Sequence, residues 1–232
     1  EVGNSGGNRA LGEATGAFIT VHDSDDWSHP EKIARQLRAL LRSRAPSTFS
    51  AWVRTTPDLA FLGPARVYPD LMGFNDSSAL FRRELFERFG GWYAARIGAD
   101  KELIWRFEHL AGRPREAFRR RMVLKDCPLS FGRLIPSSLT RTGATHVLSI
   151  YHGLRREYRE AAEFWQSGLE PRTIRREGFH ETPPFFPAPP MLRPERGAGA
   201  PLDELFVGDF NFLGGTQKSA LAMIGAARFA GL

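Results

Sequence analysis

The residues best placed to do chemistry form a short acidic run, Asp23-Ser24-Asp25-Asp26, which follows an apolar stretch over 17–21 after one residue, His22. Like charges this close raise one another's pKa, so the three carboxylates cost free energy unless something neutralises them. A divalent cation would do so, and hard oxygen ligands select Mg²⁺ or Mn²⁺. The run predicts a metal site. An acidic turn in which one Asp caps the next helix is an equal alternative.

The acidic run lies between an expected strand and an expected helix. Residues 17–21 are apolar and rich in β-branched side chains, which indicates a buried strand. Ligands of open α/β sheets bind at the carboxyl ends of strands, which is where the run falls. A helix is expected over 30–42, with Ser28 or His29 as its cap. Its apolar stripe would comprise Ile33, Leu37, Leu40 and Leu41.

Short strands and helices alternate along the rest of the chain, which favours an α/β fold. A short helix is expected before Gly16, further strands over 48–53, 66–68, 78–81 and 121–124, and helices over 84–89, 100–110 and 148–165. In the helix over 100–110, the apolar side chains share one face: Leu103, Ile104, Phe107 and Leu110.

Composition excludes several classes of protein. With 42% hydrophobic and 25% charged residues in 232, the chain is neither disordered, collagenous nor a coiled coil as a whole. The single cysteine, Cys127, excludes an intrachain disulfide and a cysteine-rich zinc site. No apolar run approaches the length of a membrane helix. The net charge of +6 comes with dispersed Arg groups, which argues against a nucleic-acid partner.

The order and spacing of several short motifs between residues 4 and 142 resemble glycosyltransferase family 2. The first part of the resemblance is Asn8-Arg9-Ala10-Leu11, Ala14, Gly16, the strand, the acidic run, Trp27 and Pro30. The second part is Asn75, residues 77–83, Gly90-Gly91-Trp92, Gly98-Ala99-Asp100, Glu102, Leu103 and Arg106. The last part is Pro128-Leu129, Arg133 and Ser138-Leu139-Thr140.

This resemblance implies a partial GT-A fold, a Rossmann-like mixed sheet with flanking helices. It implies an inverting, metal-dependent transferase that moves a sugar from a UDP- or GDP-sugar to a hydroxyl of a glycan or lipid-linked acceptor, in surface glycan or polysaccharide synthesis. The cofactor would be Mn²⁺ or Mg²⁺. The localisation that follows is cytoplasmic, with a peripheral place at the inner face of the membrane as an open alternative.

The resemblance also implies a role for each matching residue. Asp25 would bind the metal directly, Asp23 would lie against the ribose or donor sugar as well as near the metal, and Asp26 would be a second ligand or orient the loop. Asp100 would deprotonate the acceptor hydroxyl, although it could instead be only a helix cap. Further donor contacts would come from Asn8 and Ser24, and acceptor contacts from Asn75, Ser77, Trp92 and Ala99.

Two departures from the family favour a second hypothesis, a degenerate, non-catalytic module that binds or scaffolds glycan. Ala99 stands where many relatives have Glu, which leaves one carboxylate at that spot. The first strands of the family, which hold the nucleotide base, would precede Glu1, so the domain is expected to be truncated and donor binding by this piece alone weakened.

Four regions are expected. They are the partial GT-A domain over 1–142, a helical extension over 143–170, a Pro-, Arg- and Gly-rich linker over 171–201, and a strand–loop–helix fragment over 202–232. The fragment carries Phe206-Val207-Gly208-Asp209-Phe210, then Gly214-Gly215-Thr216 and Ser219, and resembles the start of a GT-B-type glycosyltransferase domain. A plain strand–turn–helix with no site of its own is an equal alternative.

Overall fold

A computed structural model of the chain describes residues 5–43, 45–63, 71–112, 122–135, 138, 140–141, 143–170, 184, 186–193 and 215–229. The chain divides into two compact units, residues 1–194 and 195–232. In the second unit the described element is one helix, α6 (Gly215–Phe229). The strand of the expected strand–loop–helix fragment over 202–232 falls before α6 and lies outside the described residues, as does the strand expected over 66–68.

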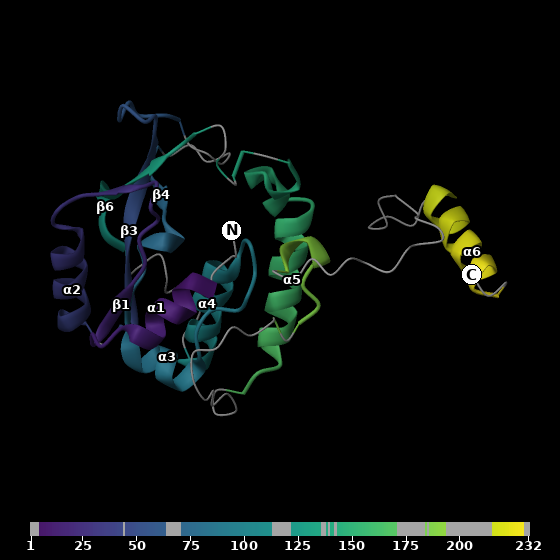
Figure 1. The fold of residues 1–232 in the computed structure, drawn as a ribbon, viewed down its shortest axis with the longest axis horizontal. Coiled ribbons are helices and arrows are strands. Elements are labelled where there is room, and N and C mark those ends of the chain that lie inside the picture. Colours follow the sequence, from purple (N-terminus) through teal and green to yellow (C-terminus); the bar gives the residue numbers. More distant parts are fainter. Residues whose placement is uncertain are drawn as a thin grey trace. The chain divides into compact units, whose positions relative to one another are not determined.

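Unit 1 contains a mixed sheet, which lies beside α2 at the left of Figure 1. The strand order is β1 (Phe18–Thr20), β5 (Leu80–Arg82), β3 (Ser47–Thr55), β6 (Met122–Arg133) and β2 (Trp27–Ser28), and β4 (Gly73–Phe74) also pairs with β3. The pair β3–β6 is parallel and the other pairs are antiparallel. Within the described ranges, β1 has a paired neighbour on one side only, which makes it an edge strand. The expected α/β class is therefore confirmed.

Helices lie on both sides of this sheet. On one side, α2 (Lys32–Arg42) packs on β3 and β5, and its Leu40 forms a buried cluster with Ala45 and with Leu80 of β5. The other side carries α1 (Ser5–Glu13), α3 (Arg83–Phe89), α4 (Ala99–Leu110) and α5 (Leu154–Ser167) (Figure 1). Short 3-10 turns η1 (Asp76–Ser78), η3 (Gly143–Thr145), η4 (Val147–Ile150) and η5 (Pro190–Leu192) link these elements.

The main core lies under α3 and α4 and is aromatic. Phe81, Phe86 and Phe107 meet edge to face, with ring centroids 5.1–5.5 Å apart, an arrangement that adds to the gain from apolar burial. The four apolar residues expected on one face of α4 are all at most 3% exposed, which confirms that prediction. The helix expected over 84–89 is also confirmed, and it ends at Gly90, where φ is +78°.

The expected buried face of α2 is only partly correct. Ile33 and Leu41 are 48% and 61% exposed, whereas Lys32, Gln36 and Leu40 are buried. Gln36 explains the difference, because its Nε2 donates to the carbonyls of Thr48 and Ser78 and so ties α2 to β3 and η1. The helix begins at Lys32, and its N-cap position is Glu31, whose side chain makes no cap bond. Of the two expected cap residues, His29 accepts the Glu31 N–H through Nδ1 at 3.2 Å and so caps the turn that leads into the helix.

Several boundaries differ from the expected ones. The first helix ends at Glu13 rather than at Gly16, and the strand expected over 78–81 is the turn η1 followed by β5. The strand expected over 121–124 extends to Arg133, because β6 pairs with most of β3. The helix expected over 148–165 is the turn η4 followed by α5, which ends at Ser167 and packs against α4.

Part of the expected linker belongs to the core. Within 171–201, Phe186, Ala188 and Leu192 are at most 4% exposed and join the main core cluster. The Leu192 carbonyl also accepts the Arg96 N–H at 2.8 Å. The described stretch over 186–193 is therefore a packed segment of unit 1. Proline-rich composition indicated its irregular backbone but not its burial.

Candidate acidic site

The acidic loop, residues 23–26, is tied to the end of β6. The Asp26 N–H donates to the Asp23 carbonyl at 3.1 Å, which closes a turn. The Asp26 carboxylate accepts the Arg133 N–H at 3.1 Å, and the Arg133 guanidinium donates to the Asp25 carbonyl. Arg133 was noted in the sequence only as part of a family motif, and this loop-fixing role has no local sequence signal.

Charge is concentrated at this loop. Burial, followed by the charges of Asp23 and Asp25, raises the pKa of Asp26 from 3.8 to about 6. The Arg133 N–H and the charge of Arg54 act in the opposite direction. The carboxylates therefore repel one another, and the loop would gain free energy from a bound cation or proton.

Lys32 is a cationic neighbour of the loop that sequence reasoning missed. It is 4% exposed in the first turn of α2, and its ammonium donates to Ser28 Oγ at 3.3 Å. Burial lowers the pKa of Lys32, while the charges of Asp23 and Asp26 oppose that effect. A buried lysine beside a carboxylate cluster offsets part of the repulsion without a metal.

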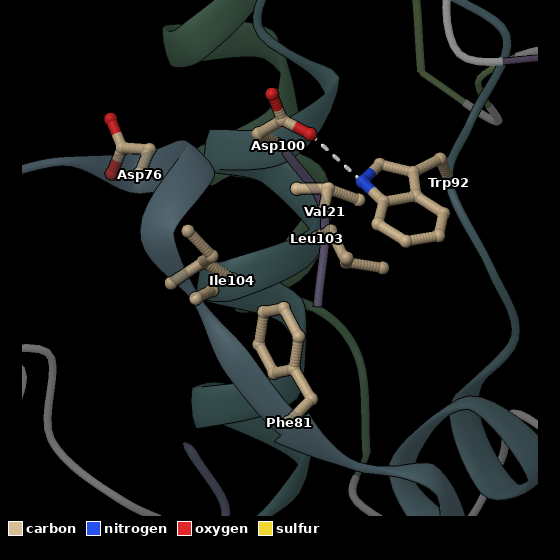
Figure 2. Close-up of a pocket in the computed structure, with 8 residues that line it drawn as sticks. Val21, Asp76, Phe81, Trp92, Asp100, Leu103 and Ile104 are labelled. Atoms are coloured by element: carbon tan, nitrogen blue, oxygen red, sulfur yellow. Dashed lines mark hydrogen bonds between the residues drawn. The ribbon is translucent and has the colours of Figure 1, made fainter. Parts of the chain in front are cut away.

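Asp100 lies in the first turn of α4 and faces the same region. Its Oδ1 accepts the Trp92 indole N–H at 2.9 Å (Figure 2). Burial, then the charges of Asp23 and Asp76, raises the pKa of Asp100 to about 6, against the Trp92 bond and Lys101. The N-cap of α4 is Gly98, and no side chain caps it, so the alternative of Asp100 as a mere cap is not supported.

A small hollow separates Asp100 from Asp76. Figure 2 shows the two carboxylates on opposite sides of it, above apolar side chains. Its lining is Val21, Asp76, Ala79, Phe81, Trp92, Asp100, Leu103 and Ile104. Asp76 begins η1 and pairs with Lys101 of α4. Sequence reasoning named its neighbours on both sides and missed Asp76 itself, although an acidic residue in the first turn of a helix is a recognisable signal.

Three of the other predicted site residues are buried. Asn8 is 3% exposed and bonds the backbone of Trp92 through both side-chain polar atoms, which corrects its expected role in donor binding. Trp92 is also 3% exposed, so a sugar ring cannot stack on it. Ala99 is 1% exposed, which removes its side chain from any acceptor contact.

Two further acceptor candidates form a turn. Asn75 is 5% exposed, and its Oδ1 accepts the Ser77 N–H at 3.1 Å, which starts η1. Ser77 is half-buried, and Ser24 is exposed in the acidic loop. Ser24 and Ser77 thus retain surface that a ligand could contact. Asn75 acts on the shape of the turn that holds Asp76.

Comparison with known proteins adds no identification. No protein-family model matches the chain, and no curated protein matches it at a significant level. Over the described ranges, no group of three or more His, Cys, Asp or Glu side chains is placed to hold a metal ion. In the same ranges, no helix is both long and apolar enough to cross a bilayer.

Proposed function

We propose that unit 1 is a sugar-transferring domain of the GT-A type that moves a glycosyl group from a UDP- or GDP-sugar to a hydroxyl of a glycan or lipid-linked acceptor. The proposal rests on the sequence resemblance to glycosyltransferase family 2 together with one structural observation. That observation is the convergence of Asp100 with the acidic loop, where the charge of Asp23 acts on Asp100 across a long stretch of sequence.

The electrostatics of Asp100 suit a general base. A base works best when its pKa lies near the operating pH, and that of Asp100 is raised to about 6. In the proposed step, the acceptor hydroxyl gives its proton to the Asp100 carboxylate as its oxygen bonds to the anomeric carbon. The bond from that carbon to the donor diphosphate breaks on the opposite face, and its electron pair leaves with the diphosphate oxygen, so the configuration inverts.

The acidic loop fits a cation that is shared with a diphosphate. Mg²⁺ and Mn²⁺ are commonly held by one or two carboxylates while phosphate oxygens and water complete the shell. Asp23, Asp25 and Asp26 repel one another at this loop, so they could supply those carboxylates. When bound, such a cation would neutralise charge on the leaving diphosphate. Arg133 fixes the backbone of the loop.

Lys32 favours a second candidate, a module of the same fold that binds glycan without catalysis. Its ammonium interacts with Asp23 and Asp26 and so reduces the need for a cation. Such a module would bind no nucleotide in a metal-dependent way.

Calorimetry of UDP and GDP binding, with and without Mn²⁺, tests the proposal. We expect binding that requires Mn²⁺ and is lost in Asp25→Ala, since the substitution removes a carboxylate from the loop. Asp58→Ala is the matched control, because Asp58 is exposed in a turn outside the loop and should leave binding unchanged. In the same protein, Asp100→Asn should keep nucleotide affinity and lower turnover by about 10²–10⁴-fold.

Three results would contradict the proposal or one part of it. Metal-independent or absent nucleotide binding by a well-folded chain would favour the non-catalytic module. Nucleotide binding that survives in Asp25→Ala would remove the metal assignment, and turnover that survives in Asp100→Asn would remove the base.

A further inference from the structure

The backbone of Trp92 is held from both sides by a residue of α1. Asn8 Nδ2 donates to the Trp92 carbonyl at 2.8 Å, and Asn8 Oδ1 accepts the Trp92 N–H at 2.9 Å. Asn8 lies in a different element, far away in the sequence, and is buried. Two hydrogen bonds shielded from water fix both peptide groups of Trp92, and hence the direction in which its side chain leaves the backbone.

The residues around the Asn8–Trp92 contact leave the Trp92 backbone and indole little room to move. A Cβ on Gly91 would lie 2.1 Å from Asn8 Oδ1, so only glycine at that position lets Asn8 approach. Arg106, which is fully buried, donates to the Gly91 carbonyl at 2.6 Å. The Trp92 indole packs on Phe86 with centroids 5.1 Å apart. The indole is therefore fixed before it meets its polar partner.

That partner is the Asp100 carboxylate. The indole Nε1–H donates to Oδ1 at 2.9 Å, and Figure 2 shows the second carboxylate oxygen pointing away from the indole. One oxygen is thus occupied and the other is left to accept a proton.

We propose that Trp92 is a positioning residue for Asp100, that Asn8 holds Trp92 in place for this purpose, and that the pair selects Oδ2 as the oxygen that receives the acceptor proton. The catalytic part of this inference rests on the proposed function. The positioning part stands on the hydrogen bonds alone. Trp92 and Asn8 thereby gain roles other than the substrate contacts expected from the sequence.

The charges around Asp100 give this inference a measurable consequence. Burial, then the charges of Asp23 in the acidic loop and Asp76 in η1, raise the pKa of Asp100, while the Trp92 N–H and Lys101 lower it. Loss of the N–H removes one of the two effects that favour the carboxylate. The ionised fraction of Asp100 at a given pH should then fall.

The test is Trp92→Phe in the full chain, which keeps an aromatic ring and removes the N–H. Carbon-13 NMR of labelled aspartate carboxyls should show the titration midpoint of Asp100 at higher pH than in the wild type. The acid limb of the kcat profile should move in the same direction. At pH 7, kcat should fall by about 10- to 100-fold while KM for the donor changes by less than about twofold.

Trp105→Phe is the matched control, since it is the same substitution on the helix that carries Asp100, and it should leave the Asp100 midpoint in place. As a reciprocal measurement, the Trp92 indole proton should exchange with solvent faster in Asp100→Ala. An unchanged midpoint in Trp92→Phe, or unchanged indole exchange in Asp100→Ala, overturns the inference. A shifted midpoint in a chain that transfers no sugar supports the positioning role and contradicts the proposed function.

Discussion

At the scale of single residues, the acidic site carries an electrostatic cost in the folded protein. Asp26 and Asp100 both have a pKa of about 6, and burial is the largest cause for each. Proteins retain such strained groups where activity needs them, at the expense of stability. The cost should appear as a dependence of stability on pH.

Asp26→Asn should stabilise the chain at neutral pH. Because folding raises the pKa of Asp26, the folded state binds more protons than the unfolded state between the ordinary value and about 6. The free energy of unfolding therefore decreases as pH rises through that window. The amide removes the repulsion and can still accept the Arg133 N–H. We expect a gain of about 1 kcal/mol at pH 7.5, after allowance for solvent screening, and none at pH 3.5.

Thermal melts at the two pH values measure this effect. Asp58→Asn serves as the control, because a hydrogen bond from Thr56 lowers the pKa of Asp58, so loss of its charge should not stabilise the chain. Equal melting temperatures of Asp26→Asn and wild type at pH 7.5 would contradict the electrostatic account.

At the scale of elements, the contact between α4 and α5 depends on Gly98. This residue caps α4 with φ at +84°, and a Cβ there would lie 2.8 Å from the Tyr158 ring. Tyr158 is 1% exposed and has little room to move. Both the backbone conformation and the close approach exclude a larger residue.

Gly98→Ala should therefore destabilise unit 1 by about 1–2 kcal/mol from backbone strain, with more from the clash. Gly12→Ala is the matched control. Gly12 lies in α1, a Cβ there would have nothing within 4 Å, and helix propensity predicts a gain of about 0.5–1 kcal/mol. Urea unfolding of both variants measures the difference. Similar stability of the two would show that the α4–α5 contact tolerates a side chain at Gly98.

Elements with strong local signals were predictable from the sequence. The apolar face of α4 and the extent of α3 both match the expected ones, because helical spacing and a glycine that ends a helix, here Gly90, are local properties of the sequence. The predicted buried face of α2 was wrong at Gln36. This polar residue is buried because its side-chain amide donates to two carbonyls that lie on other elements. Pattern alone cannot show that a polar residue is buried with distant partners.

The same reasoning applies to the site. The acidic run and Asp100 stand out by residue type, whereas the influence of the Asp23 charge on the pKa of Asp100 follows from the fold and has no signal in the sequence. Asn8 was assigned to the donor because its partner, the backbone of Trp92, is invisible in the sequence. Lys32 was missed because a lysine in a helix is ordinarily solvated.

At the scale of the whole molecule, unit 1 is closed by a segment that composition marked as a linker. Phe186 packs among Tyr158, Trp165 and Tyr93, with ring centroids 5.2, 5.8 and 6.1 Å away. This cluster joins residues from before α4, from α5 and from the end of the unit. Its loss should therefore affect unit 1 as a whole.

Phe186→Ala should lower the free energy of unfolding by about 3–5 kcal/mol, the usual cost of truncating a buried phenylalanine. Met191→Ala is the control, since Met191 is 57% exposed in the same segment and should change stability by less than about 0.5 kcal/mol. Thermal or urea unfolding of both variants provides the comparison. An equal change in the free energy of unfolding in both variants would show that the segment does not contribute to the core of unit 1.

The place of this segment in chain order has a consequence for synthesis. Tyr93 leaves the ribosome well before Phe186 and Leu192, roughly 5 to 20 s earlier at usual rates of elongation. During that interval the nascent chain exposes an aromatic surface to chaperones and to neighbouring nascent chains. The acidic loop is made early, but the core behind it is completed only when the last packed segment of unit 1 emerges.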